Sequence, residues 1–273
     1  MIKSCATIAL VPEIKAGPWI YWDGPDISIP KAAKLGFDAV ELFTASADAV
    51  DPERLEQLCD ANEIKIAAVG TGAGKVLNGW TLTSPDKHVR QKAVAFISRM
   101  VTFGARFGAP AIIGSMQGNV ESGTERPRAV AWLAEGLNEL GTLAQEQGVS
   151  LIYEPLNRYE TNMFNQLGAG AEFLKTLDSQ NVVLLADLFH MNIEEESVAG
   201  AIRANARHIG HLHFADSNRR PVGMGHTDMT DIARALTDVG YTGYASAEVF
   251  PWPDPDAAAE QTMRAFKKYF PLA

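Results

Sequence analysis

The sequence predicts an α/β protein that folds as a single (β/α)8 TIM barrel over residues 1–273, and three observations support this prediction. The chain has 273 residues, and one such barrel needs about 250. Eight strand-like segments alternate with helix-like segments along the whole length. Four side chains that suit metal binding recur in the second half at intervals of 33, 26 and 35 residues, about the length of one strand-plus-helix unit.

The expected strands are short runs rich in β-branched and apolar residues, a composition typical of strands. No low-complexity segment and no proline- and serine-rich linker separates them, so we expect one domain. The eight segments are 4–10, 38–43, 65–70, 111–116, 150–155, 182–188, 209–215 and 243–250.

The segments between these strands have the apolar spacing of amphipathic helices, most clearly at 86–107, 126–147, 166–178 and 228–238. Asp51, Asp86 and Asp228 stand where helix N-caps belong, and we expect the acidic run 194–196 to form the first turn of a further helix. Eight such units could also form an open doubly wound sheet. The length, the number of strands and the absence of a GxGxxG motif after the first strand favour the closed barrel.

Each of the last four expected strands closes on a residue with metal-ligand chemistry. These residues are Glu154, Asp187, His213 and Glu248, at the ends of the runs SLIYE, NVVLLAD, HIGHLH and YASAE. A (β/α)8 barrel builds its active site from the C-terminal ends of its strands. We therefore expect these four side chains to meet at one rim of the barrel.

The alternation of side chains along a strand provides a test of this expectation. Counting back from the four residues gives a mixed set of side chains that suits a barrel interior: Ser150, Ile152, Val183, Leu185, His211, Tyr244 and Ser246. The opposite parity is almost wholly apolar, as expected for faces that helices cover: Leu151, Tyr153, Val182, Leu184, Ala186, Leu212, Phe214, Ala245, Ala247 and Val249.

Three carboxylates and one imidazole suit a hard or borderline cation. We expect Mn²⁺, with Mg²⁺ or Co²⁺ as alternatives, and six-coordination would leave about two positions for substrate oxygens. Three carboxylates and a neutral histidine leave a net charge near −1 around a dication, so a neutral polyol suits the centre better than a polyanion. Adjacent oxygens of an α-hydroxy ketone could bind there, which would acidify the carbon-bound proton and stabilise the enediolate that follows.

Glu154 and Glu248 are the expected acid/base pair. They come from the fifth and eighth strands, three steps apart around the ring, so they approach a bound substrate from nearly opposite sides. One can remove a proton from one face while the other returns a proton to the other face, which inverts a stereocentre. An aldose–ketose isomerisation needs only one base on one face, so the pair favours epimerisation and leaves isomerisation open.

Residues beyond the strand ends suit a sugar site. Glu160 follows the fifth strand, and we expect His190 past the end of the sixth strand, in the mouth of the barrel. Arg219, in the loop after the seventh strand, offers a fixed fork of donors. Phe250 shares the parity of Glu248, so we expect it to wall the pocket.

Three further side chains, His211, Glu41 and Trp19, could have either a structural or a functional role. We interpret His211, one layer deeper than His213, as a core histidine with a hydrogen-bond partner. Glu41 could anchor a network at the mouth or contact substrate, and Trp19 could cover a sugar face or pack its own loop. Each alternative stays open at the level of sequence.

Charge and composition exclude several classes of protein. The net charge of −9 argues against nucleic-acid and anionic-membrane partners. Two cysteines, Cys5 and Cys59, are too few for a disulfide scaffold or a zinc–thiolate site. The apolar stretch before Glu13 is short for a signal peptide and far too short for a membrane span. We therefore expect a cytoplasmic protein. The site residues described above predict a small-molecule sugar as its partner, and the chain could also form a homo-oligomer such as a dimer or tetramer.

The segments EPLNRYE, DLFHMN, HFADSNRRPVGMGH and ASAEVF resemble those of ketose 3-epimerases of the D-tagatose/D-psicose type, within the xylose-isomerase-like TIM barrels. The resemblance is specific over roughly residues 150–250 and diffuse before them. It implies C3 epimerisation of a free keto-sugar, with Glu154, Asp187, His213 and Glu248 as metal ligands and Glu154 and Glu248 as the acid/base pair. It further implies that Glu160, His190 and Arg219 hold substrate oxygens.

Rival functions remain at this stage. An aldose–ketose or hydroxypyruvate-type isomerase, or an inosose-type dehydratase, could use the same metal site. An endonuclease-IV-like DNA-repair nuclease shares the barrel, but it holds three metals with several histidines, and His88 is the only histidine in the first half of this chain. A barrel that binds metal and ligand without turnover is a third alternative, which the presence of both Glu154 and Glu248 disfavours.

Overall fold

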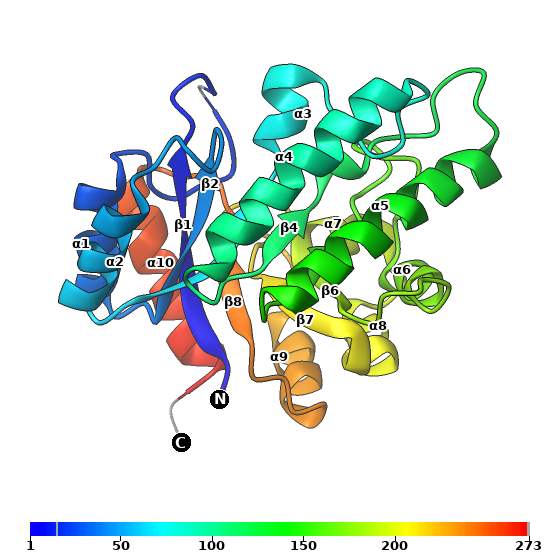
Figure 1. Cartoon of the computed structure of the whole chain (residues 1–273). Helices are drawn as coiled ribbons and strands as arrows, with labels where there is room; N and C mark the ends of the chain where they lie inside the picture. Colours follow the sequence, from blue (N-terminus) through cyan, green and yellow to red (C-terminus); the bar gives the residue numbers. More distant parts are fainter. Residues whose placement is uncertain (15, 272–273) are drawn as a thin grey trace.

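In the computed structural model the eight strands form a closed parallel barrel in chain order, and β1 pairs with β8 to close it. The structure describes residues 1–14 and 16–271. Figure 1 shows the helices arranged around the outside of the strands. The expected (β/α)8 architecture is confirmed.

The strands are β1 (Lys3–Leu10), β2 (Ala39–Thr44), β3 (Lys65–Gly70), β4 (Ala111–Ile113), β5 (Leu151–Tyr153), β6 (Val182–Asp187), β7 (Ile209–His213) and β8 (Tyr244–Ala247). The α-helices are α1 (Pro25–Leu35), α2 (Pro52–Ala61), α3 (Ala73–Asn78), α4 (Lys87–Ala105), α5 (Arg126–Glu146), α6 (Leu167–Leu174), α7 (Leu188–Glu194), α8 (Val198–Asn205), α9 (Met229–Asp238) and α10 (Pro255–Tyr269). Two 3-10 helices are η1 (Ser115–Gln117) and η2 (Ala206–His208).

The expected strands begin within one residue of the observed ones, but β4 to β8 end one to three residues earlier than expected. The chain leaves the sheet at these points to build the mouth of the barrel. It enters η1 soon after β4, and α7 follows β6 directly. Residues that the apolar pattern assigned to strand ends therefore belong to the loops of the site.

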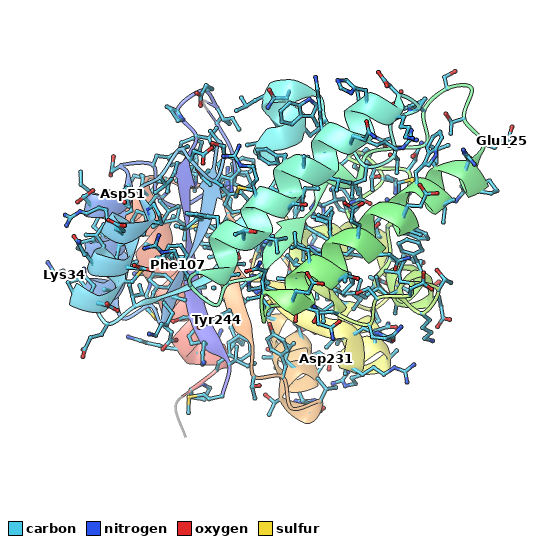
Figure 2. All side chains as sticks on the ribbon, in the orientation of Figure 1. Lys34, Asp51, Phe107, Glu125, Asp231 and Tyr244 are labelled. Carbon is cyan, nitrogen blue, oxygen red and sulfur yellow. The ribbon has the colours of Figure 1, made fainter. Side chains whose placement is uncertain are left out.

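The helix N-caps are confirmed. The side chain of Asp51 accepts hydrogen bonds from the backbone N–H groups of Glu53 and Arg54, Asp86 accepts one from His88, and Asp228 accepts one from Asp231. Asp51, which caps α2, lies at the outer surface in Figure 2, as does Glu125 before α5.

The prediction for the acidic run 194–196 is wrong. Helix α7 ends at Glu194, and α8 begins at Val198 after the N-cap Ser197. Glu194 and Glu195 instead bond to residues of neighbouring segments. Glu194 accepts hydrogen bonds from Arg158, and Glu195 accepts one from the backbone N–H of Leu167, the first residue of α6.

The alternation of side chains is confirmed. All ten residues of the apolar parity set belong to the main core, between the barrel and its helices. Of the opposite set, Ile152, Leu185 and the partly buried Val183 pack with Ala68 and Ile112 in a separate cluster inside the barrel. Residues of this second parity fill the barrel interior, and the side chains that continue it toward the strand ends meet at the mouth.

Among the described residues, no helix combines the length and the apolar composition that a membrane crossing requires.

Candidate metal centre

Glu154, Asp187, His213 and Glu248 converge at the C-terminal mouth of the barrel. One oxygen or nitrogen from each lies within 4.8 Å of those from the other three, and all four residues are buried. His213 Nδ1 is 3.5 Å from Glu154 Oε1, 3.2 Å from Asp187 Oδ2 and 3.5 Å from Glu248 Oε2. The imidazole nitrogen therefore faces a carboxylate oxygen from each of the three acids.

The ring of His213 is held from below by Glu41, on β2. His213 Nε2 lies 3.1 Å from Glu41 Oε1, and His211 Nε2 lies 2.6 Å from Glu41 Oε2. The interpretation of His211 as a core histidine with a hydrogen-bond partner is thus confirmed. Of the two alternatives for Glu41, the structure favours the anchor, because the side chain is fully buried inside the barrel and does not line the cavity.

The two carboxylate oxygens of Asp187 have different partners, one in helix α7 and one in the candidate centre. It is the last residue of β6 and the N-cap of α7, and its Oδ1 accepts hydrogen bonds from the backbone N–H groups of Phe189 and His190. Its Oδ2 faces His213. An aspartate between a strand and a helix therefore both begins the helix and orients the free oxygen toward the centre.

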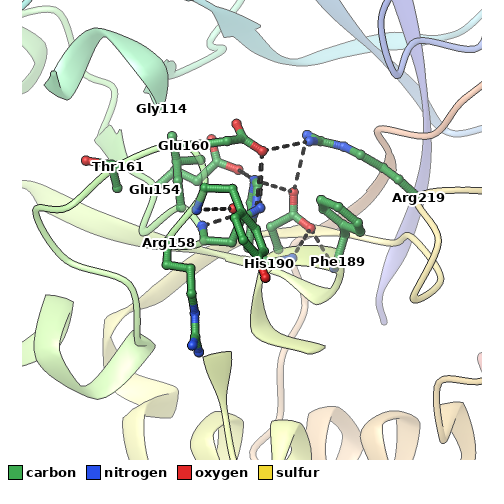
Figure 3. Close-up of polar contacts among 12 residues, drawn as sticks. Gly114, Glu154, Arg158, Glu160, Thr161, Phe189, His190 and Arg219 are labelled. Carbon is green, nitrogen blue, oxygen red and sulfur yellow. Dashed lines mark hydrogen bonds and ion pairs between the residues drawn. The ribbon is translucent and has the colours of Figure 1, made fainter. Parts of the chain in front are cut away.

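Glu154 depends on two residues that the sequence did not single out. Gln117 donates hydrogen bonds to the backbone oxygens of Gly114 and Glu154, at 2.9 Å each, and accepts one from the Tyr153 hydroxyl. A Cβ atom on Gly114 would lie 2.4 Å from Glu154 Oε2, so the carboxylate occupies space that only glycine leaves. Figure 3 shows Gly114 beside Glu154.

Burial and charge shift the proton affinities of the centre. Burial raises the pKa of Glu154, and the nearby Glu248 adds to the rise. Burial would also raise the pKa of Asp187, but His190, His213 and Arg219 outweigh it and hold the pKa below its usual range. Burial lowers the pKa of His213, but Glu248 and Glu41 more than reverse this and raise it well above its ordinary value. Without a metal ion, His213 therefore carries a proton near neutral pH.

The arrangement suits a divalent cation. Three carboxylates and one imidazole nitrogen are the donor set of a hard or borderline ion. In the described part of the chain, Glu154 Oε1 and His190 Nε2 are buried at this centre without a hydrogen-bond partner. Buried polar atoms are seldom left unpaired. A cation and the oxygens of a ligand would satisfy both atoms.

Glu160, His190 and Arg219 surround the same space, as Figure 3 shows. His190 lies in α7, past the end of β6 as expected, and its Nε2 is 3.6 Å from Asp187 Oδ2. Its Nδ1 accepts a hydrogen bond from the backbone N–H of Asn157, so Nε2 carries the ring proton. Arg219 contacts Glu248 and lies 3.4 Å from Glu160 Oε1. The expected neighbours of the centre are thus brought together.

Arg219 owes its position to a loop that Asp216 organises. The Asp216 carboxylate accepts hydrogen bonds from the backbone N–H groups of Ser217, Gly223 and Thr227. Arg219 itself has a φ of 55°, a left-handed conformation that is uncommon for residues other than glycine. The sequence offered no direct signal for Asp216 beyond its place shortly after His213.

A cavity of about 220 Å³ opens onto the centre and is lined by Glu154, Glu160, His213, Arg219 and Glu248, among others. Trp19 also lines this cavity and packs against Phe43, with ring centroids 4.9 Å apart, so both of its alternative roles are compatible with the structure. Phe250 does not line this cavity and is 44% exposed. The expected strand parity fails there because β8 ends at Ala247 and the N–H of Phe250 bonds to the backbone oxygen of Arg219.

Comparisons with known proteins agree with the barrel fold. The profile of the xylose isomerase-like TIM barrel family matches residues 29–269. A D-psicose 3-epimerase of Ruminiclostridium cellulolyticum is 32% identical over 235 residues, which cover 81% of this chain and 77% of the relative. An L-ribulose 3-epimerase of Mesorhizobium japonicum is 31% identical over 82% of this chain and 74% of its own. A crystal structure of D-psicose 3-epimerase with D-tagatose from Clostridium cellulolyticum superposes with a TM-score of 0.80 at 26% identity, covering 98% of this chain and 99% of the other.

The space at Gly114 gives a first prediction. Gly114→Ala should leave the protein folded, because the Glu154 carboxylate can move, but it should displace that carboxylate from the centre. Mn²⁺ affinity measured by calorimetry should fall about 10- to 100-fold, the range for changes to groups that position a ligand. Gly168→Ala is the matched control, since its nearest neighbour would be 3.8 Å away. Equal Mn²⁺ affinity in the Gly114 variant and the parent would contradict this role.

The raised pKa of His213 gives a second prediction. A metal ion binds the neutral imidazole, so its binding must release the proton that His213 holds. Between pH 6.5 and the raised pKa, apparent affinity should increase about tenfold for each pH unit. Calorimetry in buffers of different ionisation enthalpy should detect release of about one proton at pH 7. Binding with no release of protons would show that His213 is neutral before the ion enters.

Proposed function

The chain belongs to the xylose isomerase-like TIM barrel family, and on that premise we propose that it epimerises a free ketose at C3 with a bound divalent metal ion. Its relatives identify it as an enzyme of the ketose 3-epimerase type. The observation that carries the proposal is the placement of Glu154 and Glu248, from two separate strand ends, at one centre, where each has an oxygen 3.5 Å from His213 Nδ1.

The donor atoms that would hold the ion are His213 Nδ1 and oxygens of Glu154, Asp187 and Glu248, and Mn²⁺ is the ion that we propose. When bound, such an ion would polarise adjacent oxygens of the ketose and make the proton on C3 more acidic. The remaining chemistry belongs to side chains of this protein.

Proton removal and return are assigned to the two glutamates. Glu154 follows β5 and Glu248 follows β8, so they approach the cavity from separated positions around the ring. One takes the C3 proton from one face of the sugar while the other delivers a proton to the opposite face. Burial raises the pKa of Glu154, which helps that carboxyl hold a proton between the two steps.

The surrounding donors would fix the sugar. The Nε2–H of His190 points into the centre without a partner and can donate to a substrate oxygen. Arg219 can donate from its guanidinium, which already lies against Glu248 and Glu160. Glu160 can accept from a hydroxyl. Glu160 and Arg219 lie on loops after β5 and β7, and His190 lies in α7 directly after β6, so all three groups follow strand ends at the mouth of the barrel.

A free sugar fits this site better than a phosphorylated one. Of the described residues that line the cavity, Arg219 is the one lysine or arginine. Its guanidinium is engaged by Glu248, Glu160 and Asp187. Arg220, the other basic residue of this loop, stacks on the ring of Trp252 at 4.3 Å and does not line the cavity. A phosphate would therefore meet more negative than positive charge.

Two of the rival functions fit less well. An aldose–ketose isomerase would need one base, whereas both glutamates line the cavity here. An endonuclease-IV-like nuclease would need histidines from the first half of the barrel, and His88 is an exposed residue of α4. The net charge of −9 disfavours a DNA partner as well.

Solvent isotope exchange tests the proposal. The Mn²⁺-loaded enzyme should be incubated in D₂O with a panel of free ketoses, and deuterium should be located in the recovered sugars. We expect label at C3 together with the C3 epimer. Label confined to C1, with an aldose as product, would contradict the proposal and indicate isomerisation.

A substitution tests the role of Glu248. Glu248→Gln keeps an oxygen that can face the ion but cannot accept the proton, so kcat should fall about 10²- to 10⁴-fold while Mn²⁺ still binds. Glu260→Gln, the same change on the exposed surface of α10, is the control. Full turnover in the Glu248 variant would remove that residue from the reaction.

A further inference from the structure

We propose that Glu41 is a positioning residue that fixes the tautomer and ring orientation of His213, and that it thereby sets the affinity of the centre for a divalent ion. This inference rests on the metal centre proposed above. Glu41 lies on β2, far in sequence from the four candidate ligands and below the cavity in which substrate would bind.

Glu41 reaches His213 across the inside of the barrel. It lies on β2, and His213 lies on β7, with β8 and β1 between them in the closed sheet. The neighbouring interior positions carry small side chains, including Cys5, Ala39 and Ala67, which form a cluster of their own. These small residues leave room for a glutamate to extend toward the opposite strands, and its side chain is fully buried.

The hydrogen bonds of Glu41 determine which nitrogen of His213 is free. An ionised carboxylate only accepts hydrogen bonds. Its Oε1 lies 3.1 Å from His213 Nε2, and its Oε2 lies 2.6 Å from His211 Nε2, so both imidazoles donate their Nε2–H. In neutral His213 the lone pair therefore stands on Nδ1, the atom that faces Glu154, Asp187 and Glu248.

His211 holds the other end of the same carboxylate. It lies two residues before His213 on the same face of β7, and the two rings are nearly perpendicular, with an interplanar angle of 80°. Because His211 engages Oε2, the glutamate cannot rotate away from His213 without losing a buried hydrogen bond. His213 therefore faces the proposed ion, whereas His211 holds the carboxylate of Glu41 in place.

The cluster of Glu41, His211 and His213 is not a second metal site in this arrangement. Three potential ligand atoms come together there. However, the 2.6 Å between His211 Nε2 and Glu41 Oε2 is a hydrogen-bond distance, which leaves no space for an ion between the two atoms. A carboxylate behind a metal-binding histidine commonly orients the ring and strengthens it as a ligand.

Glu41→Gln is the informative substitution because it keeps the shape of the side chain. The amide offers one oxygen acceptor, so it cannot accept from both Nε2–H groups. We expect Mn²⁺ affinity, measured by calorimetry on the metal-free protein, to fall about 10- to 100-fold. With saturating Mn²⁺ the KM for the ketose should stay at the parent value, because Glu41 does not line the cavity. Asp38→Asn is the control, a carboxylate just before β2 that bonds to Ser4 and not to His213.

A second measurement needs no variant. In parent protein with ¹⁵N-labelled histidine and bound Mg²⁺, the long-range ¹H–¹⁵N spectrum should show the His213 proton on Nε2. A proton on Nδ1 would overturn the proposal, as would parent-like Mn²⁺ affinity in Glu41→Gln. If the parent itself binds no divalent ion, the proposed function fails together with this inference. If the parent binds the ion and Glu41→Gln binds it equally well, only the role of Glu41 fails.

Discussion

The close approach of three buried carboxylates to one imidazole nitrogen is the constraint on which the mouth of this barrel depends. Glu154, Asp187 and Glu248 each place an oxygen within 3.5 Å of His213 Nδ1. Like charges held together away from water are costly unless cations and hydrogen bonds compensate them. Arg219 supplies part of the compensation. A divalent ion would supply the rest, and it would turn an unfavourable cluster into a reactive centre.

Much of the surrounding structure keeps that cluster in place. Glu41 holds His213 from inside the barrel, and the α7 N-terminus holds one oxygen of Asp187. Gly114 leaves the space that the Glu154 carboxylate occupies, while Gln117 ties the backbone at Glu154 to the loop after β4. These contacts come from β2, from the segment after β4, and from the junction of β6 with α7, so the site depends on both halves of the chain. Closure of the barrel, which brings β8 beside β1, therefore matters directly for the chemistry.

The regular parts of the site could be predicted from the sequence, and the irregular parts could not. Parity and spacing placed Glu154, Asp187, His213 and Glu248 at one level because parallel strands of a barrel end at the same rim. The alternation of side chains along β8 wrongly placed Phe250 in the wall of the pocket, because β8 ends at Ala247 and the N–H of Phe250 bonds to the backbone oxygen of Arg219. Glu41 and His213 are 172 residues apart in the sequence, so no local sequence pattern indicates the hydrogen bond between them. The acidic run 194–196 was misread as a helix start because its partners, Arg158 and Leu167, lie on other segments.

The most direct test of this account is anomalous diffraction from a crystal grown with Mn²⁺. We predict one strong manganese peak at the barrel mouth, bound by His213 Nδ1 and by oxygens of Glu154, Asp187 and Glu248, with Glu41 still hydrogen-bonded to His213 Nε2. No peak at this position, with the four side chains directed away from one another, would contradict the central claim and the reaction derived from it.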